Sequence, residues 1–225
     1  MLSLSFSQNG QRLVSGGGEA SRSGELIIWN VTTQALSKQI NDPHSDSVFA
    51  AEFSPDDKYI ASGAADKFVK VFNAETGEHV RSYEGHTHHV MDVSWKADGA
   101  TLVSAGADNV VKVWNVETGE QRRTITSYQK QVTGVQFAGT SNQIVSSSGD
   151  KLVRIHQTSN GKNIRTLGGS TDYVFSIATL GDLSIVIGAG QDGVLRVWDG
   201  RNGKLISSFA PPTVPADDSQ ANATK

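Results

Sequence analysis

The chain has 225 residues, with 20 Lys and Arg against 23 Asp and Glu, so its formal net charge at pH 7 is -3. This balance gives no electrostatic reason to expect a nucleic-acid partner, because binding a polyanion requires a basic surface. The absence of cysteine excludes disulfides, thiolate metal sites and a thiol nucleophile, and no apolar run is long enough to cross a membrane.

Five stretches of the chain repeat one pattern, in which an aromatic residue or a histidine occupies the same position. These residues follow one another at intervals of 43, 42, 42 and 42 residues, at Trp29, Phe72, Trp114, His156 and Trp198. An aspartate column stands six residues before the last four, at Asp66, Asp108, Asp150 and Asp192, and a serine column at Ser62, Ser104 and Ser146. Columns that keep register over several copies predict a repeat architecture in which each copy packs against the next.

The first copy, over residues 1–43, starts with the strand-like LSLSF and has an extra EASRSG between its second and third predicted strands. The surrounding glycine-rich SGGGEASRSGE could be compared with a phosphate-binding loop. It lacks the Gly-Lys-Ser/Thr ending of such loops, and no helical pattern follows it. We therefore expect an elongated turn at this place.

The remaining copies, over residues 44–84, 85–126, 127–168 and 169–210, are each predicted to form four short antiparallel strands. In the third copy the strands fall at 90–95, 101–106, 110–115 and 121–126, where β-branched residues or apolar–polar alternation dominate. The segments KADG, ADN and ETGE between them supply turn residues. Residues 211–225, rich in Pro, Ala, Asp, Asn and Ser, are expected to form a disordered tail or linker.

Several motifs resemble those of the WD40-repeat family. They are GH at 85–86, FSPDD at 53–57, the aspartate column, and VWN and VWD at 113–115 and 197–199. The resemblance covers residues 1–210 and implies an all-β fold, a β-propeller of four-stranded antiparallel blades, five of which are encoded here. Rings in this family typically have seven blades. We therefore expect an incomplete seven-bladed ring rather than a closed five-bladed one, with open terminal blades that favour self-association or capping by a partner.

The resemblance also implies a buried set in which an indole N–H, a hydroxyl, an imidazole and a carboxylate are hydrogen-bonded in sequence. In the third copy these groups belong to Trp114, Ser104, His86 and Asp108. The second copy keeps His44, Ser62 and Asp66 but has Phe72, which lacks an N–H. The fourth copy places Ser146 and Asp150 with Tyr128 and His156, and the fifth has Ser170 and Gly188 beside Asp192 and Trp198. Copies with an incomplete set are expected to be held less tightly.

A nucleophile triad is the alternative interpretation of Ser104, His86 and Asp108. The second copy has the same three residue types at the same spacing, whereas an active site is needed once, and no Gly-x-Ser-x-Gly turn surrounds Ser104. We therefore interpret the set as structural and expect no catalytic residue. The segment GHTHHV brings His86, His88 and His89 together, but adjacent residues of an extended chain point apart, so we expect neither a metal site nor a cofactor.

A partner-binding surface is expected on the face where the aspartate-bearing turns emerge. The resemblance implies that residues just before and at the start of the first strand of each copy point onto this face. Gln191, from an aspartate-bearing turn, is expected to join them. The set is Ser45, Ser47, Thr87, His89, Gln129, Gln131, Thr171, Tyr173 and Gln191. It is polar, almost uncharged and includes one large aromatic residue, which suits a protein or peptide partner with Tyr173 and His89 as anchors.

We therefore expect a non-catalytic scaffold that binds a protein or peptide, and neither nucleic acid nor a membrane. Two alternatives stay open: an interaction or regulatory domain of a larger multidomain enzyme, and a propeller enzyme with a site in its central channel. Against the second, the inner strands offer only Glu52 and Asp92 for acid–base chemistry. The sequence has no recognisable targeting segment, so the compartment stays open, with the cytoplasm as the default.

Overall fold

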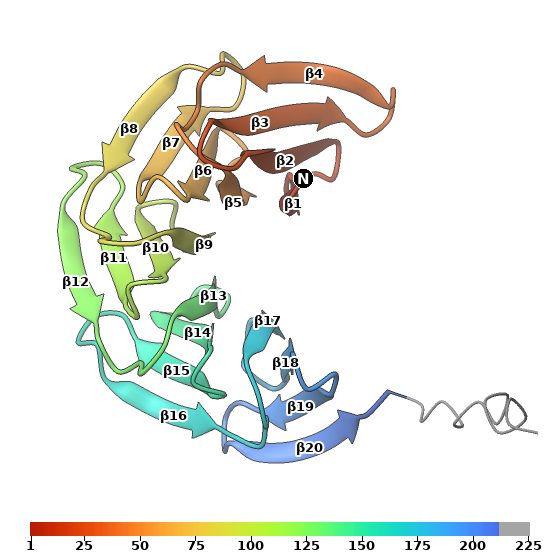
Figure 1. Ribbon diagram of the computed structural model, residues 1–225, viewed down its shortest axis with the longest axis vertical. Coiled ribbons are helices and arrows are strands. Elements are labelled where there is room, and N and C mark those ends of the chain that lie inside the picture. The colour runs from red at the N-terminus through yellow and green to blue at the C-terminus, as the bar shows by residue number, and fades with distance from the viewer. Residues whose placement is uncertain (212–225) are drawn as a thin grey trace, which may run out of the picture.

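The computed structural model describes residues 1–211 and contains twenty strands in five four-stranded antiparallel sheets. The sheets stand side by side along an arc whose two ends do not meet (Figure 1). The prediction of an all-β fold with five four-stranded blades in an unclosed ring is therefore confirmed. The tail predicted over 211–225 lies outside the described residues, except for its first residue.

Each blade takes four consecutive strands, and its first strand lies innermost (Figure 1). Blade 1 contains β1 (Ser3–Phe6), β2 (Arg12–Glu19), β3 (Ser23–Asn30) and β4 (Ala35–Ile40). Blade 2 contains β5 (Val48–Phe53), β6 (Tyr59–Ala64), β7 (Val69–Asn73) and β8 (His79–Tyr83). Blade 3 contains β9 (Val90–Trp95), β10 (Thr101–Gly106), β11 (Val111–Asn115) and β12 (Gln121–Ile125). Blade 4 contains β13 (Val132–Phe137), β14 (Gln143–Ser148), β15 (Val153–Gln157) and β16 (Asn163–Leu167), and blade 5 contains β17 (Val174–Thr179), β18 (Val186–Gly190), β19 (Leu195–Asp199) and β20 (Lys204–Phe209).

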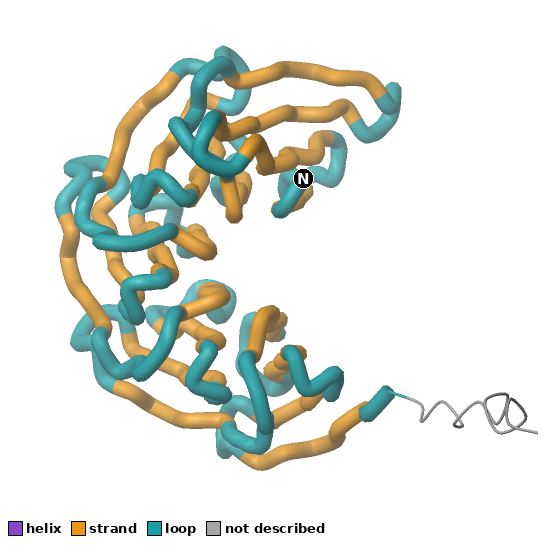
Figure 2. The backbone as a smooth tube through the Cα atoms, viewed as in Figure 1, coloured by secondary structure: helices purple, strands orange, loops and turns teal. Residues whose placement is uncertain are grey.

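Strands joined by loops make up the whole described part, as the backbone trace shows (Figure 2). Within residues 1–211, no helix has the length and apolar character needed to cross a membrane. The insertion in the first copy differs from the expected elongated turn. β2 and β3 extend into it, with Glu19 pairing with Ser23, so the added residues lengthen the hairpin ladder and leave a short turn at 20–22.

The turn between the second and third strands has one conformation in blades 2 to 5. The residue after the column aspartate has a positive φ of 65° to 76° in each blade, at Lys67, Asn109, Lys151 and Gly193. This left-handed region is costly for most residues other than glycine and asparagine. The aspartate side chain stabilises the turn, since Asp66 accepts the N–H of Phe68 and Asp192 that of Val194.

A β-bulge interrupts the pairing of the innermost strand near this same turn in blades 2 to 5. One residue there is skipped between two ladder pairs, and the four skipped residues are Phe49, Met91, Thr133 and Phe175. A bulge bends the strand and redirects the side chain of the extra residue. These four side chains therefore leave the regular alternation of the inner strands.

The hydrophobic core lies between neighbouring sheets. One cluster joins Leu26, Ile28 and Ile40 of blade 1 to Val48 and Phe53 of blade 2, and equivalent clusters lie at the next three junctions. Packing of this kind buries both faces of every inner blade. Each inner blade is consequently stabilised by its two neighbours, and each terminal blade by one, rather than by a core of its own.

Polar links between neighbouring blades recur at two nearly constant sequence separations, 43 residues on the inner strands and 36 to 38 on the outer strands. On the inner strands, the backbone N–H of Trp95 donates to Glu52 and that of Val135 to Asp92, in each case 43 residues apart. On the outer strands, the basic side chains of Lys38, Arg81 and Arg123 donate to backbone carbonyls in a turn of the following blade. Blades are thus joined at the inner wall and at the periphery.

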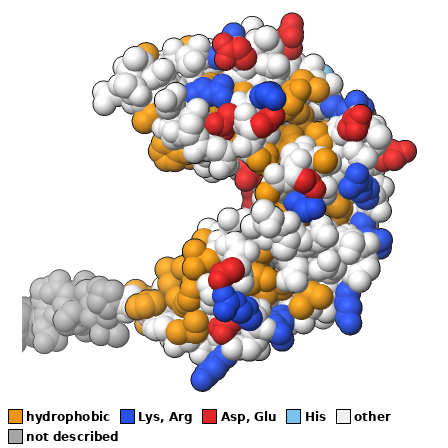
Figure 3. Space-filling model, turned by 180° about the vertical axis from the view of Figure 1, so that it is seen from behind, with side chains coloured by type: hydrophobic (Ala, Val, Ile, Leu, Met, Phe, Trp, Pro, Cys, Tyr) orange, Lys and Arg blue, Asp and Glu red, His pale blue; other side chains and the backbone are white. Residues whose placement is uncertain are grey.

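The two end faces of the arc expose residues whose counterparts in other blades are buried. Phe6 in blade 1 is 60% exposed, whereas Phe53, which has the same place in blade 2, is 1% exposed. At the other end Phe209 is 60% exposed, whereas its counterpart Tyr83 is 1% exposed. Hydrophobic side chains gather on the surface at this lower end of the arc in Figure 3. The two end faces therefore present the same residue positions that pack against each other between neighbouring blades inside the arc.

Candidate functional site

Four hydrogen-bonded side chains in blade 3 join β10, β11 and the turn between them to the loop that precedes β9. The Trp114 Nε1–H donates to Ser104 Oγ at 2.8 Å, and Ser104 Oγ lies 2.7 Å from His86 Nε2. His86 Nδ1 lies 2.9 Å from both carboxylate oxygens of Asp108. Because a carboxylate only accepts, the imidazole proton belongs on Nδ1, which leaves Nε2 to accept the Ser104 hydroxyl proton.

Electrostatics favours an ionised aspartate at the end of this chain. Burial acts to raise the pKa of Asp108, but hydrogen bonds from His86 and from the Thr87 amide outweigh it and lower that pKa. Ser104 is completely buried, so no substrate can reach its hydroxyl. A nucleophile must be accessible. The arrangement therefore stabilises a turn and gives no support to the triad interpretation.

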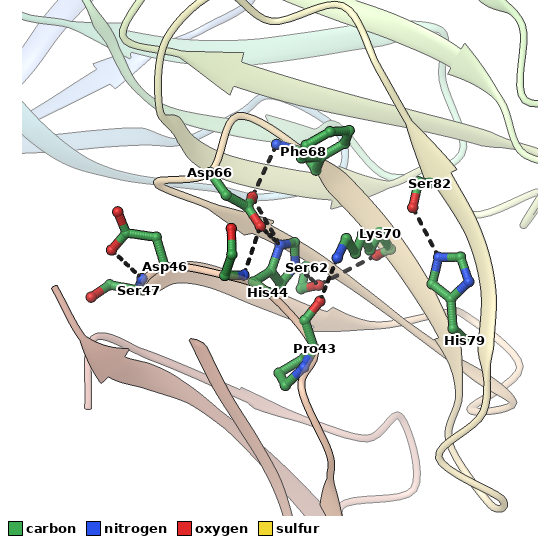
Figure 4. Close-up of polar contacts among 11 residues, drawn as sticks. Pro43, His44, Asp46, Ser47, Ser62, Asp66, Phe68, Lys70, His79 and Ser82 are labelled. Carbon is green, nitrogen blue, oxygen red and sulfur yellow. Dashed lines mark hydrogen bonds and ion pairs between the residues drawn. The ribbon is translucent and has the colours of Figure 1, made fainter. Parts of the chain in front are cut away.

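Blade 2 forms the same set without the indole (Figure 4). His44 Nε2 lies 2.8 Å from Ser62 Oγ, and His44 Nδ1 lies 2.9 Å from an oxygen of Asp66. Phe72 occupies the tryptophan position and is buried against the edge of the His44 ring, with 6.4 Å between ring centroids. Burial lowers the pKa of His44 despite the neighbouring Asp66, which keeps this imidazole neutral.

Blade 4 departs from the expected grouping. Tyr128 Oη lies 2.7 Å from Ser146 Oγ and 3.3 Å from His156 Nδ1, so these three side chains do meet. Asp150 does not join them: its carboxylate pairs with Arg154 at 2.8 Å instead. The reason is that tyrosine replaces the histidine of blades 2 and 3, while an arginine supplies the missing donor from four residues after the aspartate.

Blade 5 uses the same arginine substitution. Asp192 pairs with Arg196 at 2.8 Å, and the Trp198 Nε1–H donates to the Gly168 carbonyl at 3.1 Å because glycine replaces the column serine at 188. Ser170 accepts a long hydrogen bond of 3.4 Å from Arg196. The sequence signals this change of partner. The position four residues after the column aspartate holds lysine in blades 2 and 3, where the histidine is present, and arginine in blades 4 and 5, where it is replaced.

The column aspartates also position the candidate binding face, called here the loop face. Each accepts the backbone N–H of the residue after the histidine position, and these donors are Ser45, Thr87, Gln129 and Thr171. All four donor residues are exposed, as is Gln191. A buried ion pair or hydrogen-bonded set beneath each loop thus holds an exposed polar residue in a defined place.

The other proposed contact residues lie two positions further along the chain. His89, Gln131 and Tyr173 are half-buried and keep part of their surface on the loop face. Ser47 is 5% exposed, so it is unsuited to partner contact. Its backbone carbonyl accepts the N–H of Ala65, and the carbonyls of His89, Gln131 and Tyr173 accept the equivalent N–H groups. The backbone position is therefore the same in all four blades, and the short side chain of serine does not reach the surface.

Two aromatic pairs at the inner edge of the loop face were missed by sequence reasoning. The bulged residue Phe49 packs on His89, with 5.8 Å between ring centroids, and the bulged residue Phe175 packs on Tyr173 at 6.1 Å. Phe175 is 52% exposed, and Lys130 lies over the Tyr173 ring at 4.7 Å. The available signal was an apolar residue that breaks the alternation in VFAAEF and VFSIAT.

The channel wall carries Glu52 and Asp92, on β5 and β9. Both carboxylates accept backbone N–H groups of the following blade, as described above. Burial raises the pKa of Glu52 to about 8 and that of Asp92 to about 7. Across residues 1–211, no group of three or more His, Asp or Glu side chains is arranged to hold a metal ion.

The protein consists of four-stranded sheets stacked face to face, and blades 2 to 5 each contain a buried polar set. This arrangement defines a repeat protein built from propeller blades. The chain belongs to the WD40 family, whose model, described as "WD domain, G-beta repeat", matches residues 1–30, 37–73, 77–115, 119–157 and 161–199. Each matched segment after the first joins the fourth strand of one blade to the first three strands of the next.

Similar curated proteins share short stretches with this chain. It is 33% identical to Protein HIR1 of Eremothecium gossypii over 91 residues, which cover 33% of this chain and 10% of that protein. It is 51% identical to apoptotic protease-activating factor 1 of Homo sapiens over 49 residues, or 22% and 4% of the two chains. It is 34% identical to the Notchless protein homolog of Arabidopsis thaliana over 76 residues, or 34% and 15%. The chain therefore spans at most 15% of the length of these relatives.

Proposed function

We propose that the chain is a non-catalytic scaffold that binds a protein or peptide on its loop face. The supporting observation is the pair of aromatic contacts at the inner edge of that face, Phe49 with His89 and Tyr173 with Phe175. Partly exposed aromatic side chains held by their neighbours bury much area at a small entropic cost, which makes them effective anchors. Membership of the WD40 family supports a protein-interaction role of this kind.

Uncharged polar residues complete the proposed site, next to Lys130, which lies over the Tyr173 ring. Ser45, Thr87, Gln129, Thr171 and Gln191 supply hydrogen-bonding groups without the desolvation cost of charge. The units carrying this face are proposed to be the repeats at 1–43, 44–84, 85–126, 127–168 and 169–210. Because the site spans several blades, it is expected to require the assembled arc.

Replacing Tyr173 and His89 together by alanine is expected to weaken loop-face binding by about tenfold to a hundredfold, since central aromatic anchors dominate interface energy. The measurement starts from peptides selected on the wild-type protein out of a random display library. Their affinities for wild type and variant are then compared by fluorescence anisotropy. Selected peptides that bind the double variant as tightly as wild type would contradict the loop-face assignment.

A glycine offers a second variant that leaves the anchor side chain intact. A Cβ at Gly149 would lie 2.3 Å from the Tyr173 ring, so Gly149→Ala must displace that ring. We expect Gly149→Ala to weaken the same peptides. Gly99→Ala has nothing within 4 Å of its Cβ, but its φ of 66° makes the substitution costly to the backbone, so it serves as a control for a general loss of stability.

The open ends of the arc suggest a second association. We propose that the exposed face of blade 5, with Leu195 and Phe209, packs against the exposed face of blade 1, with Leu4 and Phe6, in another copy of the chain. The support is continuity: these faces repeat the positions that pack between every pair of neighbouring blades. Exposed apolar patches on a single copy favour association.

Static light scattering over a concentration series is expected to give an apparent mass that rises with wild-type concentration. Phe209→Glu should reduce the mass to that of a monomer, because a charge would then be buried in the interface. Ile164→Glu, an exposed apolar position away from both ends, is the matched control and should associate like wild type. A wild-type mass that stays monomeric throughout the series would rule this association out.

A further inference from the structure

We propose a second binding site on the face opposite the loop face, in a groove between blades 2 and 3. The groove has a volume of about 590 Å³ and is formed by β7, β8, and the turns around Pro55, Gly99 and Glu117. Its occupant is a short extended segment of a partner protein that carries an apolar side chain next to a lysine or arginine. This site is independent of the loop face and of the ends of the arc.

The floor of the groove is apolar. It is lined by Tyr59, Val71, Tyr83 and Val116, with Val80 at the edge, where it is 48% exposed. The Tyr83 hydroxyl donates to the Val116 carbonyl at 3.1 Å, and burial raises the pKa of Tyr83 to about 12. The hydroxyl is therefore neutral and already occupied, which leaves the ring for apolar contact.

The equivalent crevice one blade further on is smaller and more polar, and three substitutions account for this difference. Positions 42 residues after Val80, Ala100 and Val116 hold Arg122, Asn142 and Thr158. There the Arg122 side chain donates to the Thr101 hydroxyl at 3.4 Å, and the cavity is about 190 Å³ with mostly polar side chains. The groove between blades 2 and 3 is thus a property of these residues and not a general feature of stacked blades.

The rim of the groove carries an excess of negative charge. Asp56, Asp98 and Glu117 line it, against the single lining cation Arg81. Arg81 donates to the Thr118 carbonyl at 3.3 Å and so is committed to the neighbouring blade. Glu117 forms no ion pair with any residue between 1 and 211.

Two lysines also lie near the rim, but Glu117 still favours a ligand with a positive charge. Asp56 pairs with Lys58 at 3.2 Å, and Asp98 pairs with Lys96 at 2.8 Å. The first pair is exposed and contributes little energy, whereas the Lys96 side chain is only 16% exposed, so the second pair is held more firmly. Glu117 is therefore the carboxylate that favours a cationic side chain of the ligand and disfavours an acidic one.

The size of the groove limits what it can hold. Pockets of roughly 300 to 1,000 Å³ take a small ligand or one or two side chains. A cationic residue beside an apolar one would place its charge at the rim while the apolar group covers the floor. Single-site contacts of this extent are weak, with a dissociation constant on the order of 1 mM.

The test uses the full chain, labelled with ¹⁵N, and three acetylated, amidated pentapeptides. Their sequences are Gly-Lys-Leu-Lys-Gly, Gly-Glu-Leu-Glu-Gly and Gly-Lys-Ser-Lys-Gly. The first is expected to shift the amide signals of Gly99, Ala100 and Val116 with a dissociation constant on the order of 1 mM, and the other two to bind about tenfold more weakly or less. Equal binding of the acidic and basic peptides, shifts centred elsewhere, or no shifts with any of them would overturn the proposal.

Two variants test the groove itself. Val80→Arg introduces the arginine found at the smaller junction between blades 3 and 4, and it is expected to weaken the first peptide by about tenfold. Ile164→Arg places arginine at the equivalent exposed position of blade 4 and is expected to leave its binding unchanged. Glu117→Lys, on the exposed rim, should remove the preference for the basic peptide without closing the groove. Retained binding in Val80→Arg would show that the peptide sits outside the groove.

Discussion

Trp114→Ala is expected to lower the free energy of unfolding by about 3 to 5 kcal/mol, the usual cost of removing a large buried aromatic side chain. The indole is 1% exposed, and it packs in the cluster between blades 2 and 3. Its loss also leaves the Ser104 hydroxyl without its donor. Urea unfolding followed by circular dichroism measures the change.

Trp114→Phe removes the N–H but keeps an aromatic ring in the cluster, so it retains part of the packing. Phenylalanine already occupies this position in blade 2, at Phe72, so the blade accepts its shape. We expect Trp114→Phe to cost about 1 to 2 kcal/mol, mainly through the lost N–H bond. Ser104→Ala should cost more than Ser62→Ala, because Ser104 bonds both an indole and an imidazole while Ser62 bonds the imidazole alone among side chains. Equal costs for the two serine variants would show that the four-membered set adds nothing to the three-membered one.

Glu52→Gln is expected to make the protein more stable at alkaline pH while changing little near pH 5. The pKa of Glu52 is raised from 4.5 to about 8 in the folded state, so the folded chain binds more protons than the unfolded chain between these values. The free energy of unfolding of wild type therefore falls as pH rises through this window. Glutamine stays neutral and keeps an oxygen to accept the Trp95 N–H.

The size of this effect follows from about 1.4 kcal/mol for each unit of pKa shift. Because Glu52 is partly exposed to the channel, we expect a gain of about 1 to 3 kcal/mol at pH 9, below the full shift. Asp92→Asn should act in the same direction over a narrower range, since the pKa of Asp92 is about 7. Glu75→Gln, at an exposed turn, is the control. The measurement is urea unfolding at several pH values, and a stability difference that is independent of pH would refute the assignment.

Most of the strand pattern could be predicted because turns and strands alternate on a fixed repeat. In blade 3 the predictions for 90–95 and 101–106 coincide with β9 and β10, and those for 110–115 and 121–126 exceed β11 and β12 by one residue each. The end residues differ because the last ladder pair depends on the neighbouring strand, which the local sequence does not contain.

The side-chain sets were predictable where histidine and tryptophan stand in register, and less so where they are replaced. Asp150 pairs with Arg154 because Tyr128 offers the carboxylate no equivalent donor. The bulged residues Phe49 and Phe175 were missed because a two-residue alternation carries no information on where a strand will skip one residue. The groove between blades 2 and 3 depends on small or apolar residues converging from distant segments, which becomes apparent only in three dimensions.

The links between blades have a consequence for how such a chain can change over time. Since the inner and outer links each connect a residue of one blade to a fixed place in the next blade, duplicating or deleting one whole repeat recreates every link at the new junction, provided that the adjoining repeats carry the same residues. A gain or loss of any other length would shift donors past their acceptors. Genomes can therefore lengthen or shorten this arc in steps of one blade, with each step leaving the rest of the molecule undisturbed.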